Sequence, residues 1–217
     1  MEFEELLHIV GQEPVFPTGL LLAGDVDPDH IRRQLVRWAD SGKVYQLRRG
    51  LYALAPPYQQ VKPHPFLVAN HLVRPSYVSL QSALAYYGMI PEYVPTTTSV
   101  TTDRPREFDT PLGKYSFRHI KKERFFAYQV EQAAENQEVF LAVPEKALLD
   151  QVYLRAGGDS IAYLKSLRLQ NLDQLNPYAL KDIARRASSP KLERAADNII
   201  SIAEEEGDHE SLSPETG

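Results

Sequence analysis

The chain has 217 residues, of which 43% are hydrophobic and 24% charged, as expected for one large or two small globular domains. It contains no cysteine, so disulfide bonds and cysteine-ligated metal centres are excluded. The N-terminus is acidic and amphipathic, unlike a signal peptide, and no apolar run approaches the roughly 18 residues of a membrane span. We therefore expect a cytoplasmic protein without a membrane partner.

The net charge of −5 conceals a local excess of positive charge. Between His30 and Gly50, six basic side chains stand against a single acid, Asp40. Nucleic acid responds to the local field rather than to the total charge of a protein, so this segment could face DNA although the chain is acidic overall. Residues 204–217 carry acids without any lysine or arginine and are predicted to form a disordered tail.

The first unit, residues 1–58, is predicted to begin with two helices. Apolar residues at helical spacing indicate a helix over residues 2–10. A turn that contains two prolines follows, and then a short second helix over residues 19–23. Thr18 is the expected N-cap of this short helix, and Gly24 its end.

A third helix and a β-hairpin complete the first unit. The acid–proline–acid sequence at residues 27–29 is a strong helix start, and Gly42 is the expected stop. Two β-rich runs, residues 43–47 and 51–54, flank an Arg-Arg-Gly turn and predict a hairpin. Three helices followed by a hairpin is the order of a winged helix-turn-helix.

The third helix is expected to have one apolar and one basic face. Ile31, Leu35 and Trp38 share a face, so we assign Trp38 to the core rather than to base stacking. An arginine on the opposite face could contact guanine, a glutamine could contact adenine, and basic groups of the hairpin could reach phosphates or a minor groove. The candidate DNA-binding residues are His30, Arg32, Arg33, Gln34 and Arg37 on the helix, and Lys43, Arg48 and Arg49 in or beside the hairpin.

A basic helix face can also be an ordinary solvated surface. The short helix before it, the acid–proline start and the basic hairpin after it favour DNA binding over that alternative.

Residues 59–65 are rich in proline and are predicted to be a stiff linker between two units that each bury their own core. The second unit, residues 66–203, is predicted to be an α+β domain with a mainly antiparallel sheet followed by C-terminal helices. Its expected helices span residues 65–73, 78–88, 144–154, 160–167, 177–187 and 190–203, and its expected strands span residues 96–102, 114–120, 125–130 and 139–143.

A second basic cluster lies on the predicted strand over residues 114–120 and on the loop that follows it. A solvated sheet face, an auxiliary contact with DNA phosphates and a surface for an acidic partner are all open explanations. The cluster consists of Lys114, Arg118, Lys121, Lys122 and Arg124.

Catalysis is not expected. Glu145 and Lys146 are adjacent at a predicted helix start, whereas a metal-dependent nuclease needs groups that converge on the metal. Asp150, one turn later, is expected to face outward or to make a structural hydrogen bond. Neither a serine nucleophile motif nor a phosphate-binding loop is present, and the histidines are scattered. We therefore predict no enzymatic activity, no cofactor and no metal site.

Three blocks of sequence resemble the AbiEi-type antitoxins of bacterial type IV toxin–antitoxin systems. The blocks are LVRW, GKV and LRRGLYAL within residues 35–54, PSYVSLQSAL and GMIPE within residues 75–92, and PEKALLD at residues 144–150. The resemblance covers about residues 1–155. It implies a winged-helix transcriptional repressor of its own operon that also neutralises a nucleotidyltransferase toxin, with operator DNA and that toxin as partners. A dimer on DNA is left open.

Two other hypotheses are considered. The protein could be a plain DNA-binding regulator whose second domain senses a small molecule or dimerises. It could also be a nuclease or a nucleotidyltransferase that carries a DNA-targeting domain.

Overall fold

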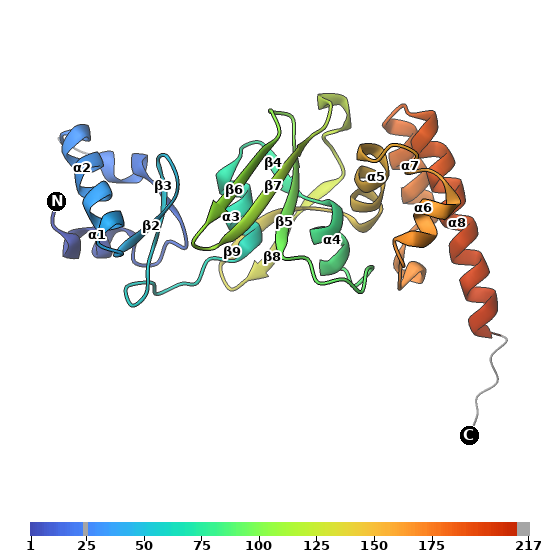
Figure 1. Cartoon of the computed structure of the whole chain (residues 1–217), viewed down its shortest axis with the longest axis horizontal. Helices are drawn as coiled ribbons and strands as arrows, with labels where there is room; N and C mark the ends of the chain where they lie inside the picture. Colours follow the sequence, from blue (N-terminus) through green and yellow to red (C-terminus); the bar gives the residue numbers. More distant parts are fainter. Residues whose placement is uncertain (24–25, 212–217) are drawn as a thin grey trace, which may run out of the picture.

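The computed structural model describes residues 1–23 and 26–211, and it has the mixed α and β composition that the sequence predicts. Along the longest axis of the molecule, the N-terminal unit is followed by a six-stranded sheet and then by a group of helices (Figure 1). Within the described ranges, no helix combines the length and the apolar character that crossing a lipid bilayer requires.

The N-terminal unit has the predicted order of helices and hairpin, with two differences. The second helix is a 3-10 helix that begins at Thr18, so Thr18 is not its N-cap and makes no capping hydrogen bond. Its predicted stop, Gly24, lies outside the described residues. A two-residue strand that was not predicted joins the hairpin to form a three-stranded sheet of order β1-β3-β2. The elements are α1 (Phe3–Val10), β1 (Phe16–Pro17), η1 (Thr18–Leu22), α2 (Pro28–Asp40), β2 (Val44–Arg48) and β3 (Leu51–Leu54).

Helix α2 begins and ends as predicted. The Asp27 carboxylate accepts a hydrogen bond from the backbone N–H of Asp29 at 2.9 Å, and proline occupies the first helical position. After the helix, Gly42 adopts a φ of +70°, which a residue without a Cβ reaches without steric cost. Trp38 is buried and packs edge-on against the ring of Phe3, so its assignment to the core is confirmed.

Strand β3 is buried on both faces and joins two cores. Side chains alternate along a strand, so Tyr52 and Leu54 pack into a core with α1 and α2, while Leu51 and Ala53 pack into the large core of the second unit. Leu47 on β2 joins the second core as well. Each unit therefore has a core of its own, and residues of the hairpin also join the core of the second unit.

The second unit is built on a six-stranded sheet of order β6-β7-β5-β4-β9-β8. Antiparallel pairs β6–β7, β5–β4 and β9–β8 alternate with parallel pairs β7–β5 and β4–β9, so the sheet is mixed, with antiparallel pairs in the majority. The strands are β4 (Ser76–Val78), β5 (Thr96–Thr101), β6 (Arg106–Thr110), β7 (Gly113–His119), β8 (Tyr128–Ala134) and β9 (Gln137–Ala142).

Helices accompany the sheet and follow it, as predicted. Helix α3 packs on β4 and β9, while α4 contacts β5 on one side and α5 on the other. The helices are α3 (Pro65–Leu72), α4 (Leu80–Tyr86), η2 (Lys122–Arg124), α5 (Pro144–Leu154), α6 (Ile161–Ser166), η3 (Leu172–Gln174), α7 (Pro177–Arg186) and α8 (Pro190–Ser211).

Several boundaries in the second unit differ from the predictions. The predicted helix over residues 78–88 is the end of β4 followed by α4, and the predicted strand over residues 125–130 begins only at Tyr128. Strand β6 was not predicted because its exposed residues are mostly charged or polar, which is common on an edge strand. The predicted disordered tail is wrong for residues 204–211, which continue α8. Residues 212–217 lie outside the described part of the chain.

Candidate functional site

The basic face of α2 is exposed, as the helical spacing predicts. Its opposite face is fixed in the core by Ile31, Leu35 and Trp38. His30, Arg32, Arg33 and Arg37 lie on the exposed surface, and Gln34 is half-buried at the edge of the helix.

Two of these arginines make ion pairs with acids at the start of the helix. Arg32 pairs with Asp29 at 2.6 Å, and Arg33 pairs with Asp27 at 3.6 Å. All four side chains are more than half exposed, and pairs of this kind contribute only about 0–1 kcal/mol in water. Among the described residues, Arg37 has no ion-pair partner. The basic face is thus available to an incoming anion.

The two arginines of the hairpin turn point to different places. Arg49 is exposed at the turn and has no ion pair within the described part of the chain. The guanidinium of Arg48 instead donates a hydrogen bond to the carbonyl oxygen of His71, at the end of α3, at 3.3 Å. The register shifts between Gln46 and Arg48, and such a bulge changes the direction of the side chains that follow it.

The surroundings of Arg48 also differ from those of a free surface arginine. Its pKa is lowered by partial burial and then by repulsion from Arg106 and Arg74. Arg48, predicted to bind DNA, is exposed and also connects the hairpin to the second unit through this hydrogen bond.

The side chain of Lys43 also makes a contact within the protein. Its ammonium lies 4.4 Å from the centre of the Phe3 ring, within the range of a cation–π interaction. Lys43 therefore supports the packing of α1 against the start of the hairpin in addition to any contact it makes outside the protein.

The second basic cluster does not form one uniform surface. Lys114 pairs with Asp109 of the neighbouring strand at 3.6 Å, and both side chains are well exposed. Arg124 donates a hydrogen bond to the Tyr153 hydroxyl at 3.1 Å and stacks on the same ring, so it belongs to the packing of η2 on α5. Arg118, Lys121 and Lys122 remain exposed.

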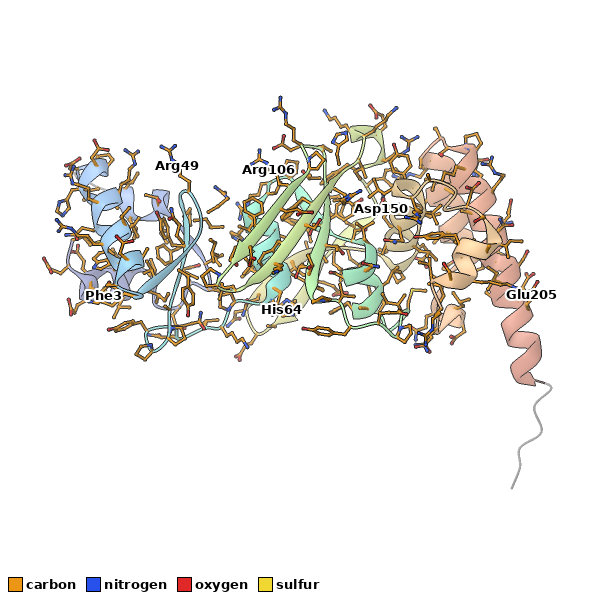
Figure 2. All side chains as sticks on the ribbon, in the orientation of Figure 1. Phe3, Arg49, His64, Arg106, Asp150 and Glu205 are labelled. Carbon is orange, nitrogen blue, oxygen red and sulfur yellow. The ribbon has the colours of Figure 1, made fainter. Side chains whose placement is uncertain are left out.

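Arg74 and Arg106, which are not among the candidate DNA-binding residues, lie near the hairpin. Both are close enough to Arg48 to lower its pKa by charge repulsion. Figure 2 shows Arg49 and Arg106 on the same side of the molecule. Arg106 lies on the strand that was not predicted, and Arg74 stands alone between apolar residues and a proline, so no local pattern in the sequence marks either.

Glu145, Lys146 and Asp150 lie in the interior of the second unit. All three are buried. Glu145 accepts a hydrogen bond from the backbone N–H of Asn176 at 2.8 Å, and the ammonium of Lys146 contacts the carboxylate of Asp150. Across residues 1–23 and 26–211, no three histidine, aspartate or glutamate side chains are placed to hold a metal ion.

Asp150 makes structural hydrogen bonds, which was one of the two outcomes expected for it. Tyr77 and Ser79 donate their hydroxyl hydrogens to its carboxylate at 3.0 and 2.8 Å. Burial raises the pKa of Asp150, and Lys146, Ser79 and Tyr77 oppose that rise. Burial also raises the pKa of Tyr77, followed by the charge of Asp150, so this hydroxyl remains a hydrogen-bond donor.

Comparisons of the chain with protein-family models and with curated proteins find no match.

Proposed function

We propose that the protein is a sequence-specific DNA-binding transcriptional repressor and that its N-terminal unit is a winged helix-turn-helix. The observation that supports this most directly is the construction of α2. One face is held in the core. The other presents exposed arginines next to a hairpin whose turn carries the exposed Arg49. A major groove admits an α-helix, and arginine on that helix can donate two hydrogen bonds to guanine.

The ion pairs on α2 are compatible with this role. Arg32 and Arg33 would exchange exposed carboxylates, Asp29 and Asp27, for phosphate or base acceptors at little cost. Arg37 has no such partner among the described residues, so it is the arginine that we assign to base recognition. Arg49 would contact the backbone or an adjacent minor groove.

Selection from a random DNA library with the full-length protein tests the proposal. We expect an enriched motif, and we expect that motif upstream of the protein's own coding sequence if the repressor regulates itself. Retention of DNA without an enriched motif would leave only non-specific, charge-driven binding and would contradict the proposal.

We also propose that the protein acts as the antitoxin of a nucleotidyltransferase toxin, on the basis of the three sequence blocks described above. Two of these blocks meet in the interior of the second unit, where Tyr77 and Ser79 contact Asp150. The resemblance therefore concerns residues that stabilise the fold, and it does not by itself mark a surface for the toxin.

Co-expression with a nucleotidyltransferase encoded beside the gene tests the antitoxin role. The full chain, produced from an unrelated promoter, is expected to rescue growth. An Arg37→Gln variant produced in the same way is expected to rescue as well, because neutralisation does not require repression. If the full chain gives no rescue, the antitoxin role is wrong and a plain regulator takes its place.

A further inference from the structure

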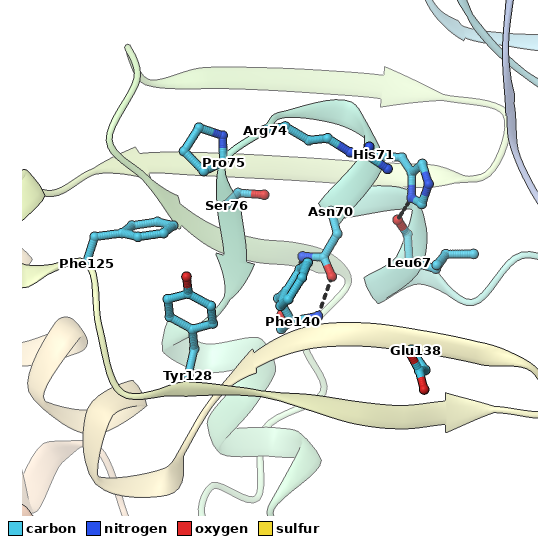
Figure 3. Close-up of a pocket in the computed structure, with 10 residues that line it drawn as sticks. All are labelled: Leu67, Asn70, His71, Arg74, Pro75, Ser76, Phe125, Tyr128, Glu138 and Phe140. Atoms are coloured by element: carbon cyan, nitrogen blue, oxygen red, sulfur yellow. Dashed lines mark hydrogen bonds between the residues drawn. The ribbon is translucent and has the colours of Figure 1, made fainter.

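A cavity of about 560 Å³ opens between α3, the start of β4 and the strands β8 and β9. Figure 3 shows the rings of Phe125, Tyr128 and Phe140 beside it, and Arg74 on the far side with its side chain directed toward His71. Tyr128 and Phe140 are 36% and 47% exposed, so two aromatic rings face solvent at the same hollow. Small-molecule sites typically have volumes of about 300–1,000 Å³, mostly apolar walls and few polar groups.

The aromatic walls are held by the interior of the second unit. The ring of Tyr128 stacks on Tyr77 with the centroids 4.7 Å apart, and Tyr77 is anchored to Asp150 by its hydroxyl. Phe125 contacts both tyrosines, and Phe140 meets Tyr128 edge-on at 5.9 Å. The walls are thus positioned before any ligand arrives, which lowers the entropy that binding would cost.

Arg74 is the one positively charged side chain among those that line the cavity. It is exposed, and it has no ion pair within the described part of the chain. Two of the other polar side chains are engaged: Ser76 donates to the Val73 carbonyl, and the Asn70 amide exchanges two hydrogen bonds with the backbone of Phe140. Glu138 lies away from Arg74 in Figure 3, so an anionic group is favoured only at the Arg74 end.

Two residues that line the cavity also contact or influence the hairpin. The carbonyl oxygen of His71 accepts the hydrogen bond from Arg48, and the charge of Arg74 repels Arg48. A carboxylate on Arg74 would reduce that repulsion and strengthen the Arg48–His71 contact. Occupancy of the cavity would therefore hold the hairpin more firmly against the second unit.

We propose that this cavity binds a small aromatic carboxylate, with its ring among Phe125, Tyr128 and Phe140 and its acid group on Arg74. Binding is transmitted to the hairpin through Arg48. Neither the site nor its effect on the hairpin depends on the proposed DNA-binding function.

Calorimetry on the full-length protein with 1-naphthoate, indole-3-acetate and salicylate tests the site. We expect at least one of the three to bind at millimolar concentration or below, and its neutral amide to bind at least about tenfold more weakly, because hydrogen bonds to charged groups are the stronger ones. Arg74→Gln should weaken the same carboxylate by a similar factor. Arg185→Gln, which removes an exposed arginine on α7, is the matched control and should change nothing.

The site is refuted if none of the three carboxylates binds, or if the Arg74→Gln and Arg185→Gln variants bind the carboxylate with equal affinity. Hydrogen exchange of the backbone amides in residues 44–54 then tests transmission, in the absence of DNA. The bound carboxylate should slow this exchange in the wild type. The carboxylate should still bind the Arg48→Gln variant, but it should not slow hydrogen exchange in residues 44–54 of that variant. Equal slowing in both proteins would refute the role of Arg48. Because neither measurement uses DNA, failure of the DNA-binding proposal would leave both results intact.

Discussion

Lys146 and Asp150 lie one turn apart on α5 and form an ion pair whose side chains are only 4% and 3% exposed. The carboxylate also accepts hydrogen bonds from Tyr77 and Ser79. A buried charge is tolerated when it is paired and its remaining hydrogen-bond capacity is satisfied, and both conditions hold for the Asp150 carboxylate. The pair links α5 to β4 and α4, and so fixes the centre of the second unit.

Removal of one partner of this pair is expected to destabilise the protein strongly. Asp150→Asn leaves the ammonium of Lys146 without a counter-charge, and losses of about 3–5 kcal/mol are usual for such changes. Urea unfolding measures the effect. The control is Lys181→Met, which breaks the exposed pair with Asp197 and should cost less than about 1 kcal/mol. Equal effects of the two substitutions would contradict the structural role given to the buried pair.

The hairpin is expected to stabilise the second unit. A fragment that begins at residue 60 lacks Leu47, Leu51 and Ala53, which pack into the large core in the full chain. We expect this fragment to unfold at lower urea concentration than the second unit does in the full chain, and to bind a hydrophobic dye at its uncovered face. An unchanged midpoint without dye binding would show that the two units are independent.

Stability is expected to fall as the pH drops below the ordinary pKa of histidine. Burial lowers the pKa of His64 and of His71, so the unfolded chain binds more protons than the folded protein between the lowered and the ordinary values. The contribution of these two histidines to the free energy of unfolding is complete above about pH 6.5. It is lost as the pH falls through the lowered pKa values. The free energy of unfolding should therefore decrease from about pH 7 to about pH 5. In a His64→Gln/His71→Gln variant, the free energy of unfolding should decrease less over the same range. An identical slope in the variant would count against this assignment.

Local signals in the sequence were sufficient for the elements that depend on them. The acid–proline start of α2 is confirmed by the Asp27 hydrogen bond, and the proline at the start of α5 occupies the first helical position as predicted. Strand β4 was missed because it is short and wholly buried, and a short apolar run does not reveal whether it continues as a helix or a strand. The double burial of β3 depends on packing between distant segments, which periodicity alone does not report.

The candidate site was predictable where it depends on helical spacing. The exposure of Arg33 and Arg37 follows from the burial of Leu35 and Trp38 on the opposite face. The direction of Arg48 was not predictable, because it depends on a bulge in β2 and on the position of α3. Arg74 and the aromatic cavity were missed for the same reason, since their neighbours come from segments far apart in the sequence.

The two arginines of the hairpin turn are expected to differ in their effect on DNA binding. If Arg49 contacts a phosphate, Arg49→Gln should weaken binding to all sequences and reduce the salt dependence by about one unit of slope. Arg48→Gln should leave the slope unchanged, because its guanidinium is bonded to the His71 carbonyl. Titrations across a series of salt concentrations measure both slopes. A loss of slope in Arg48→Gln but not in Arg49→Gln would reverse the two assignments.

The most direct test of the DNA-binding proposal compares Arg37→Gln with Arg185→Gln, both as full-length proteins, on the selected DNA motif and on a scrambled duplex. A base contact by arginine contributes about 1–3 kcal/mol of discrimination, so Arg37→Gln should lose roughly tenfold or more in affinity for the motif and much less for the scrambled duplex. Arg185→Gln should bind both duplexes as the wild type does. Equal losses on the two duplexes for Arg37→Gln, or wild-type binding of the motif, would contradict the proposal that α2 reads the DNA sequence.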